Sequence, residues 1–348
     1  MILSKVRVVK KKRVRKGIIA CFLLIAVALS GAFIVHRADI DVPHLCYAGP
    51  DEAIWNIGIY DIRDDGRSLI LSGSEGNPVL TADDVKDIPA RFVADPFLIQ
   101  ERDTFYLFFE VMGVDRGVIG LATSADGRRW RYERIVLEEP FHLSYPNVFK
   151  WKDEFYLVPE SVADHSVRLY KATHFPDGWQ LVKPIITDRA LVDSTVLTHR
   201  GLLWLFSSSP DSQNLYLFYA DRPDGPWHEH PGSPIVRGNG RDARPAGNIL
   251  DRGGRLIRFS QDSQANGEKY GKAVRGFEIM TLTRDEYRER PLEENPLLRD
   301  SGAGWNATGM HQISASPVSS GRWIAAVDGK RRSDRYTFCL GNTIFRWP

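Results

Sequence analysis

The sequence is poor in cysteine and lacks the short motifs that identify several large enzyme classes. Its 348 residues include three cysteines, and no CxxC pair or zinc-type spacing of Cys and His occurs. There is no glycine-rich phosphate loop and no GxSxG motif. These absences argue against a zinc module, a P-loop nucleotide hydrolase and an α/β-hydrolase. We expect neither a metal nor a cofactor.

The net charge is small but unevenly distributed. It is +2, and eight Lys and Arg residues, with no acid among them, fall within residues 1–16. Without these eight, 38 bases remain against 44 acids. A nucleic-acid binder carries its basic face on the folded domain. We therefore expect no nucleic-acid partner and interpret residues 1–16 as a basic cytoplasmic arm.

A long uncharged segment follows this arm. Residues 17–35, GIIACFLLIAVALSGAFIV, contain no charged side chain. A helix of this length, at about 1.5 Å per residue, approaches the ~30 Å thickness of a bilayer's hydrocarbon core. Because basic flanks stay in the cytoplasm, the pattern predicts a single-pass, type II signal anchor. The rest of the chain would face the periplasm or the extracellular side, or the Golgi lumen in a eukaryote. A signal peptide cut near Ser30–Ala32 is the alternative.

Residues 36–51 contain the breakers Pro43 and Pro50 and are interpreted as a tether. Two cysteines, Cys46 and Cys339, lie near opposite ends of the exported part. In an oxidising compartment these two could form a disulfide. Two unrelated buried thiols are an equally supported alternative.

A pair of apolar strands recurs along residues 52–348. The first strand of each unit reads VADPFLI (93–99), LSYPNVF (143–149), LVDSTVL (191–197), ARPAGNIL (243–250) and GMHQISA (309–315). The second reads FYLFFE (105–110), FYLVPES (155–161), LLWLFSSS (202–209), LIRFSQD (256–262) and WIAAVDG (323–329). A period of roughly 50 residues, with about four strands per unit, predicts an all-β, five-bladed β-propeller.

A β-sandwich is the alternative fold, but it does not explain the regular repeat. In the propeller, the last strand, residues 336–348, is expected to share a blade with the first strand, near residues 53–62. This pairing would close the ring and bring Cys46 and Cys339 into one neighbourhood.

Polar residues recur at matching positions of the repeats. The first strands align Asp95, Tyr145, Asp193, Arg244 and His311, and the second strands end on Glu110, Glu160, Ser208, Gln261 with Asp262, and Asp328. Burying so many ionisable groups without a function would be costly. Carboxylates can share acid and base roles across a glycosidic bond, while Arg and His bind hydroxyls or an anion. We therefore predict a carbohydrate site in the channel.

Further binding residues are expected at the channel mouth. The polar segment 260–272 is long for a propeller turn and could form a lid. The complete set of predicted substrate-binding residues is Glu110, His142, Tyr145, Arg244, Gln261, Asp262, Tyr270, Lys272, His311 and Asp328. Structural alternatives remain open, including a turn cap for Asp95, a solvated strand end for Glu160 and an interblade ion pair for Glu110.

The ordered set VADPFL, LFFE, HLSYP, VPES, LVDS, LWLF, DGPW, SQD, YGK and VDG resembles a known family. It is similar to the N-terminal propeller domain of plant glucosamine inositolphosphorylceramide transferases and to stand-alone bacterial relatives of that domain. The resemblance covers about residues 52–332. In the plant proteins a separate glycosyltransferase domain follows the propeller. The resemblance therefore implies an association with glycosyl transfer, and a glycosyltransferase as partner, rather than the transfer reaction itself.

More distantly, the repeat resembles five-bladed glycoside hydrolases of the family-43 and family-32 kind. In those enzymes an inner-strand Asp of the first blade is base or nucleophile, a second Asp tunes its pKa and a Glu is the acid. Asp95 matches the first role. Blade two departs from the pattern with Tyr145, followed by Glu160, and blade three has Asp193 where an acid Glu is expected. The resemblance implies Asp95 as base or nucleophile, Glu160 as acid and Asp193 as a tuning or orienting residue.

The sequence thus predicts a membrane-anchored, carbohydrate-active propeller that acts on a cell-envelope polysaccharide or a glycolipid, in a glycosidase-like reaction. The alternative is a non-catalytic glycan-binding or scaffolding propeller that serves a partner glycosyltransferase.

Overall fold

The computed structural model describes residues 45–48, 52–64, 68–187, 189–264, 270–319, 322–341 and 343–347. Nearly all of them belong to one compact unit, Cys46–Pro348. The predicted arm, signal anchor and most of the tether lie outside the described residues. Within the described part, no helix is long and apolar enough to cross a membrane. The helices found there are short 3₁₀ turns: η1 (Ala82–Asp84), η2 (Val162–Asp164) and η4 (Gly304–Asn306).

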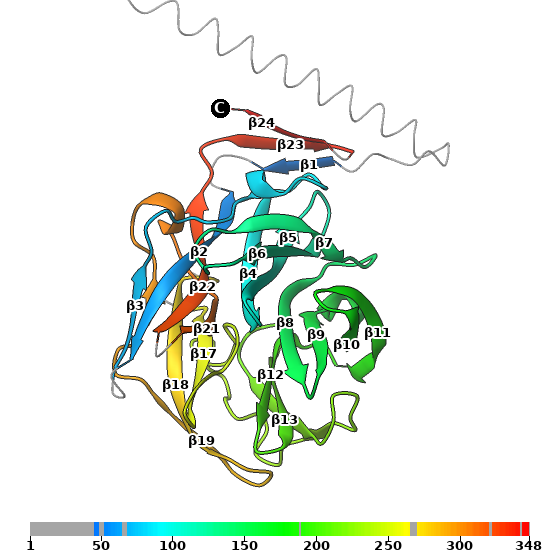
Figure 1. Ribbon diagram of the computed structural model, residues 1–348, viewed down its shortest axis with the longest axis vertical. Coiled ribbons are helices and arrows are strands. Elements are labelled where there is room, and N and C mark those ends of the chain that lie inside the picture. Colours follow the sequence, from blue (N-terminus) through cyan, green and yellow to red (C-terminus); the bar gives the residue numbers. More distant parts are fainter. Residues whose placement is uncertain are drawn as a thin grey trace, which may run out of the picture. The chain divides into compact units, whose positions relative to one another are not determined.

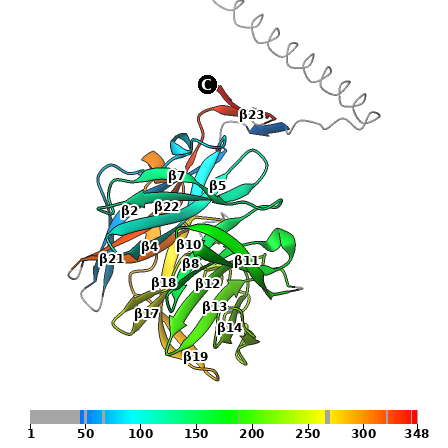
Figure 2. The same cartoon turned by 45° about the vertical axis from the view of Figure 1, so that its right-hand side comes forward.

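Four blades are continuous in sequence, each an antiparallel sheet. The first two are β4 (Phe92–Glu101), β5 (Thr104–Met112), β6 (Gly117–Ser124) and β7 (Arg131–Leu137), then β8 (Ser144–Trp151), β9 (Glu154–Glu160), β10 (Val167–His174) and β11 (Asp177–Ile186). The third is β12 (Val192–His199), β13 (Leu202–Ser208), β14 (Leu215–Ala220) and β15 (His228–Glu229), of which Figure 2 shows β12, β13 and β14 side by side. The fourth is β16 (Leu250–Arg252), β17 (Arg255–Asp262), β18 (Ala273–Leu282) and β19 (Tyr287–Pro291), with β20 (Leu298–Arg299) also paired to β18.

The fifth blade joins both ends of the propeller. It contains β21 (Ile313–Ser319), β22 (Arg322–Arg332), β2 (Ala53–Asp64) and β3 (Leu69–Gly73) in that order. Figure 1 shows the red β22 beside the blue β2, and their register runs from Ala53 opposite Arg332 to Ile62 opposite Trp323. The predicted five-bladed propeller is therefore confirmed.

The predicted closing strand was wrong. Residues 336–348 form β23 (Tyr336–Leu340) and β24 (Thr343–Trp347), which share a separate sheet with β1 (Leu45–Ala48). The edge of β22 is already paired with β2 over ten consecutive partners, so no edge remains there for a further strand. The strand β1 also lies inside the predicted tether.

Both cysteines of the predicted pair belong to strands of this separate sheet. Cys339 is disulfide-bonded, and β1, which contains Cys46, neighbours β23. The Cys46 side chain is outside the described residues, so its pairing with Cys339 stays a prediction.

Both faces of each blade are buried against neighbouring blades. In β5, Phe105, Leu107 and Phe109 pack towards the fifth blade, whereas Phe108 packs towards the second. This follows from the period-2 alternation of a strand, in which successive side chains point to opposite faces. Five separate apolar clusters result, one at each of the five blade–blade interfaces.

The inner strands share a kink at the same position in three blades. Asp95, Tyr145 and Asp193 have φ of 53°, 46° and 52°, and the strand register shifts beside each of them. Positive φ is uncommon for non-glycine residues, and a β-bulge re-aims a side chain out of the regular alternation. These kinks release the three side chains from the interface cores.

The Tyr145 side chain links the inner strand of blade two to the neighbouring blades. This side chain is fully buried. Its hydroxyl oxygen accepts a hydrogen bond from the Gly247 N–H at 2.6 Å and lies 2.8 Å from Thr195 Oγ1. A tyrosine of blade two therefore ties together blades three and four.

We predict that Tyr145→Phe lowers the free energy of unfolding by about 1–3 kcal/mol, because the buried Gly247 N–H loses its acceptor. Urea titration of the full chain in detergent would measure this loss. The matched control is Tyr106→Phe in β5, whose hydroxyl has no hydrogen bond assigned among the described residues. Equal losses in both variants would contradict the role of the Tyr145 hydroxyl.

Candidate functional site

A cavity of about 340 Å³ opens where the first strands of the blades begin. Seven of the predicted site residues line it: Asp95, Glu110, His142, Glu160, Arg244, Tyr270 and His311. The remaining lining residues were not among the predicted site residues: Trp55, Phe92, Ala94, Met112 and Ser144. Three carboxyl groups from blades one and two thus share one cavity with an arginine and two histidines.

Asp328, His311 and Asp95 lie in a row of charged groups at one side of the cavity. Asp328 Oδ2 lies 2.7 Å from His311 Nδ1, and His311 Nε2 lies 3.6 Å from Asp95 Oδ1. Asp328 also accepts backbone N–H bonds from Asp95, His311 and Gln312 at 3.0–3.2 Å. Asp328 is fully buried and occupied by these contacts, so it orients its neighbours and does not line the cavity.

Asp95 combines burial with one unoccupied oxygen. Its Oδ2 accepts the Tyr145 N–H at 3.2 Å, whereas Oδ1 has no hydrogen-bond partner among the described residues. Burial raises the pKa of Asp95 to about 7, although the nearby His311 acts in the opposite direction. The side chain is therefore divided between its two protonation states near neutral pH.

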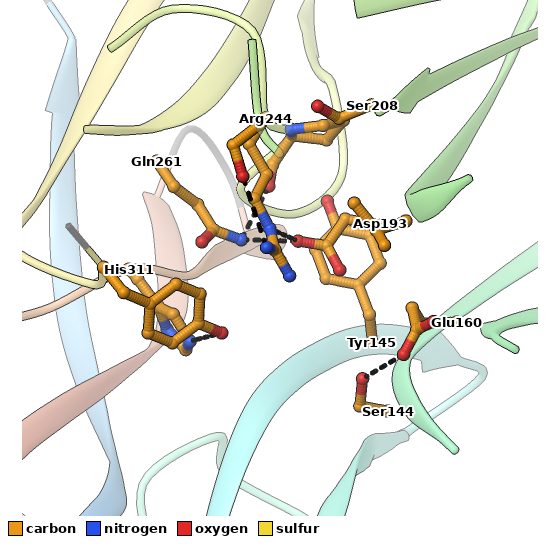
Figure 3. Close-up of polar contacts among 12 residues, drawn as sticks. Ser144, Tyr145, Glu160, Asp193, Ser208, Arg244, Gln261 and His311 are labelled. Carbon is orange, nitrogen blue, oxygen red and sulfur yellow. Dashed lines mark hydrogen bonds and ion pairs between the residues drawn. The ribbon is translucent and has the colours of Figure 1, made fainter. Parts of the chain in front are cut away.

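Glu160 lies at the end of β9 in a similar environment. Its Oε1 accepts the Val162 N–H at 2.6 Å, and its Oε2 accepts the Ser144 hydroxyl at 3.2 Å. Burial, and then the charge of Asp193, raise the pKa of Glu160 to about 7. Figure 3 shows the Ser144 bond that fixes this carboxyl group. Glu160 is not a solvated strand end, which was the structural alternative.

Glu110, at the end of β5, contacts His142. Its Oε1 lies 3.5 Å from His142 Nε2, while His142 Nδ1 accepts the Gly117 N–H at 2.9 Å. Burial, followed by the neighbouring carboxylates, raises the pKa of Glu110 well above its usual value. Gly117 permits this approach, since a Cβ there would lie 2.4 Å from the Leu143 carbonyl and 2.8 Å from Glu110 Oε1. Burial and the neighbouring carboxylates thus both favour the protonated form of Glu110.

Asp193 is held by two donors from blade four. Its Oδ2 accepts Arg244 Nε at 2.6 Å and Gln261 Nε2 at 2.7 Å, as Figure 3 shows. Gln261 in turn donates to the Pro245 carbonyl at 2.9 Å. Arg244 lines the cavity, but Asp193 and Gln261 do not. Their effect on a bound molecule would pass through the placement of Arg244.

The aromatic rings of Trp55 and Tyr270 form a further part of the cavity wall. Trp55 stacks on His311 with ring centroids 3.9 Å apart, and the Tyr270 hydroxyl lies 3.0 Å from His311 Nε2. Gly271 has φ of 67°, and a Cβ there would lie 2.6 Å from the Trp55 ring. Only glycine fits this conformation and this spacing, which lets Tyr270 reach the cavity. Trp55 belongs to β2, outside the repeated strand pair, so the column alignment could not reveal it.

Three predicted binding residues are occupied elsewhere. Tyr145 binds Gly247 and Thr195, as described above. Asp262 accepts Arg241 Nε at 3.1 Å, and Lys272 donates to Asp300 at 3.3 Å. None of the three lines the cavity, because each meets its polar partner within the scaffold. The predicted lid is described only in part, since residues 265–269 lie outside the described residues.

Asp95, His311 and Asp328 are the group within the described part whose ligand atoms could share a cation, lying within 4.8 Å of one another. His311 Nδ1 already lies 2.7 Å from Asp328 Oδ2, and Asp328 accepts three backbone N–H bonds. These contacts are those of an imidazole paired with a carboxylate.

A larger hollow, of about 1020 Å³, lies between the β4–β5 turn of blade one and the strands of blade two. Its charged lining groups, such as Glu101 and Lys150, are half-exposed and paired with each other at 3.0 Å. It lacks the unpaired, buried carboxyl groups of the axial cavity. We therefore place the candidate site at the axis.

The axial cavity can offer both states of a carboxyl group at neutral pH. Asp95 and Glu160 have pKa values of about 7, and burial also raises the pKa of Glu110 well above its usual value. A protonated carboxyl donates a proton or a hydrogen bond, and an ionised one accepts it. This combination is suited to general acid–base chemistry on a polyhydroxylated molecule.

Comparison with solved structures gives the fold class. An alpha-L-arabinofuranosidase from Podospora anserina, in complex with cellotriose, aligns with a TM-score of 0.52 at 15% identity, over 82% of this chain and 98% of that chain. A GH43_1 enzyme from Xanthomonas citri, complexed with xylotriose, aligns with a TM-score of 0.52 at 16% identity, over 73% and 92%. At such identities the likeness concerns the propeller fold alone.

Sequence comparison is more specific. The family model described as Glucosamine inositolphosphorylceramide transferase 1, N-terminal, matches residues 71–330. Glucosamine inositolphosphorylceramide transferase 1 of Oryza sativa subsp. japonica is 39% identical over 310 residues, which cover 81% of this chain and 41% of that protein. The Arabidopsis thaliana protein is 36% identical over 307 residues, covering 81% and 39%. The chain spans about two fifths of the length of the curated relatives it matches. The resemblance seen in the sequence is confirmed, and the chain belongs to the family of the N-terminal domain of glucosamine inositolphosphorylceramide transferase 1.

Proposed function

We propose that this chain is a carbohydrate-active propeller whose axial cavity takes a glycosyl unit of a cell-envelope polysaccharide or a glycolipid in a glycosidase-like reaction. One observation carries the proposal. Asp95 and Glu160 line one cavity with pKa values near 7, and neither forms an ion pair with an Arg or Lys of the described part. Carboxyl groups kept for structure alone are normally paired.

In this reaction Asp95 is the base or nucleophile. Its Oδ1 has no partner, and the electrostatic effects of His311 and Arg244 favour its ionised form. Glu160 is the general acid, because Ser144 and the Val162 N–H hold its carboxyl group in place at the same cavity. Asp193 fixes the guanidinium of Arg244, which is then available to hydroxyl or anionic groups.

The second candidate is a non-catalytic glycan-binding propeller that serves a glycosyltransferase. It is favoured by the names of the relatives, which are transferases, and by the family model for their N-terminal part, which matches residues 71–330 of this chain. Both candidates use the same cavity, but only the first requires bond cleavage.

The membrane location is part of the proposal. An uncharged run at residues 17–35 behind a basic arm supports a type II anchor with the propeller on the periplasmic or extracellular side, or in the Golgi lumen of a eukaryote.

The deciding experiment is a glycan-array screen of the full chain in detergent, with released sugar assayed in the same wells. We predict that Asp95→Asn lowers turnover by roughly 10²–10⁴-fold while binding is retained, because the amide cannot act as base or nucleophile. Asp285→Asn, an exposed site in blade four, is the matched control. Binding without release in both the native chain and Asp95→Asn would establish the non-catalytic candidate.

The pH dependence of kcat/KM should be bell-shaped with its maximum near neutrality. Turnover is lost on the acid side as Asp95 becomes protonated, and on the alkaline side as Glu160 loses its proton. Initial rates between pH 5 and 9, within about two units of the two pKa values, would trace both limbs. A rate that rises steadily across this range would remove Glu160 as the acid.

Glu160→Gln should stabilise the protein at alkaline pH. The folded-state pKa of Glu160, about 7, lies above its unfolded value of 4.5. Stability is therefore lost as the pH rises from about 4.5 to about 7, and the loss is complete at higher pH. We expect a gain of about 1–3 kcal/mol at pH 8 and little change below pH 4.5. Thermal unfolding at both pH values, with exposed Glu293→Gln as control, would measure it. A gain independent of pH would show that ionisation is not the cause.

A further inference from the structure

The β23–β24 hairpin carries an exposed apolar face. Tyr336, Phe338 and Leu340 alternate along β23 and are 43%, 44% and 47% exposed. Phe345 of β24 is 51% exposed, stands directly opposite Phe338, and has its ring centroid 6.4 Å from that of Phe338. Large apolar side chains gathered on one strand face mark a contact surface rather than a solvent-facing one.

The opposite face of the hairpin is fixed to the propeller. Thr337 and Cys339 are buried there, and Cys339 is disulfide-bonded. Arg346, opposite Thr337 in the register, donates to the Ala90 carbonyl at 2.8 Å and pairs with Asp83 at 3.2 Å. Both residues precede β4. The hairpin is therefore held on one side and presents the apolar side outward.

The length of the chain before β1 limits the possible partners of this face. Residues 36–44 separate the apolar segment 17–35 from β1, the neighbour of β23. Nine extended residues at about 3.3–3.6 Å each reach roughly 30 Å. If residues 17–35 are anchored as proposed, the sheet that contains β23 stays within that distance of the bilayer surface.

We propose that the face formed by Tyr336, Phe338, Leu340 and Phe345 docks on the lipid bilayer. Aromatic side chains favour the headgroup level of a membrane, where an apolar ring is buried and a hydroxyl stays hydrated. Arg335, whose side chain is 58% exposed at the start of the hairpin, suits anionic headgroups. The inference rests on the proposed membrane anchor.

Docking in this way would select the substrate. Phe92, at the start of β4, lines the axial cavity, and Ala90, two residues earlier, binds the hairpin. The cavity and the apolar face thus belong to the same end of β4. A propeller held by this face has its cavity beside the bilayer, which favours the headgroup of a membrane glycolipid over a free polysaccharide.

Photo-cross-linking tests the contact directly. The full chain is reconstituted into nanodiscs of phosphatidylcholine and phosphatidylglycerol, with p-benzoylphenylalanine at Phe338 or Phe345. Ile70 and Met280, which are 56% and 52% exposed on the blades, are the matched control positions. We expect lipid adducts at the two hairpin positions and only background at the two controls. Equal yields at all four positions, adducts to a second copy of the chain, or no adducts would overturn the proposal.

This result is separable from the chemistry of the cavity. Lipid adducts should be unchanged in Asp95→Asn. Adducts formed by a native chain that releases no sugar would contradict the glycosidase reaction and leave the docking surface standing. A second measurement compares two double variants. One combines Phe338→Ser and Phe345→Ser in the hairpin, and the control combines Ile70→Ser and Met280→Ser on the blades. We expect the hairpin pair alone to lose binding of a glycolipid in vesicles while keeping binding of the released headgroup. If the hairpin variant lost binding of the vesicle glycolipid and of the released headgroup equally, the link to the membrane would be overturned.

Discussion

The burial of both faces of every blade is the constraint on which this structure depends. A strand such as β5 sends alternate side chains into two different apolar clusters, so each blade needs a neighbour on either side. An open row of blades would leave one such face exposed at each end. The pairing of β2 with β22 removes both ends at once and holds the ring together without a covalent bond.

The same packing determines the chemistry at the axis. Carboxyl groups of Asp95, Glu110 and Glu160 lie where water is largely excluded, and burial raises the pKa of each of them. The kinked inner strands deliver two of the acidic residues, Asp95 and Asp193, without breaking the interface cores. A buried arginine satisfies Asp193 but not the other carboxyl groups. This uneven pairing separates a supporting carboxylate from those that face the cavity.

Much of the fold and half of the site could be predicted from the sequence, because strand alternation and repeat spacing are local properties. The position of Asp95 and of Glu160 follows from the columns of the repeat. Whether a buried polar side chain faces the cavity or the scaffold depends on partners that are distant in sequence, such as Gly247 for Tyr145 and Asp300 for Lys272. Such long-range partners leave no local pattern. Trp55 was missed because β2 completes a blade whose other strands come from the opposite end of the chain.

The closure of the ring also places the two boundaries of the propeller beside each other. Ala53, where the domain begins, is the cross-strand partner of Arg332, where the last blade strand ends. A polypeptide that enters at one point therefore leaves next to it, about 5 Å away across the ladder. In a longer relative, a domain that follows the propeller would start beside the incoming N-terminal segment. When this ring is inserted into a larger protein, the segments before and after it therefore stay close together, because the propeller adds almost no distance between them.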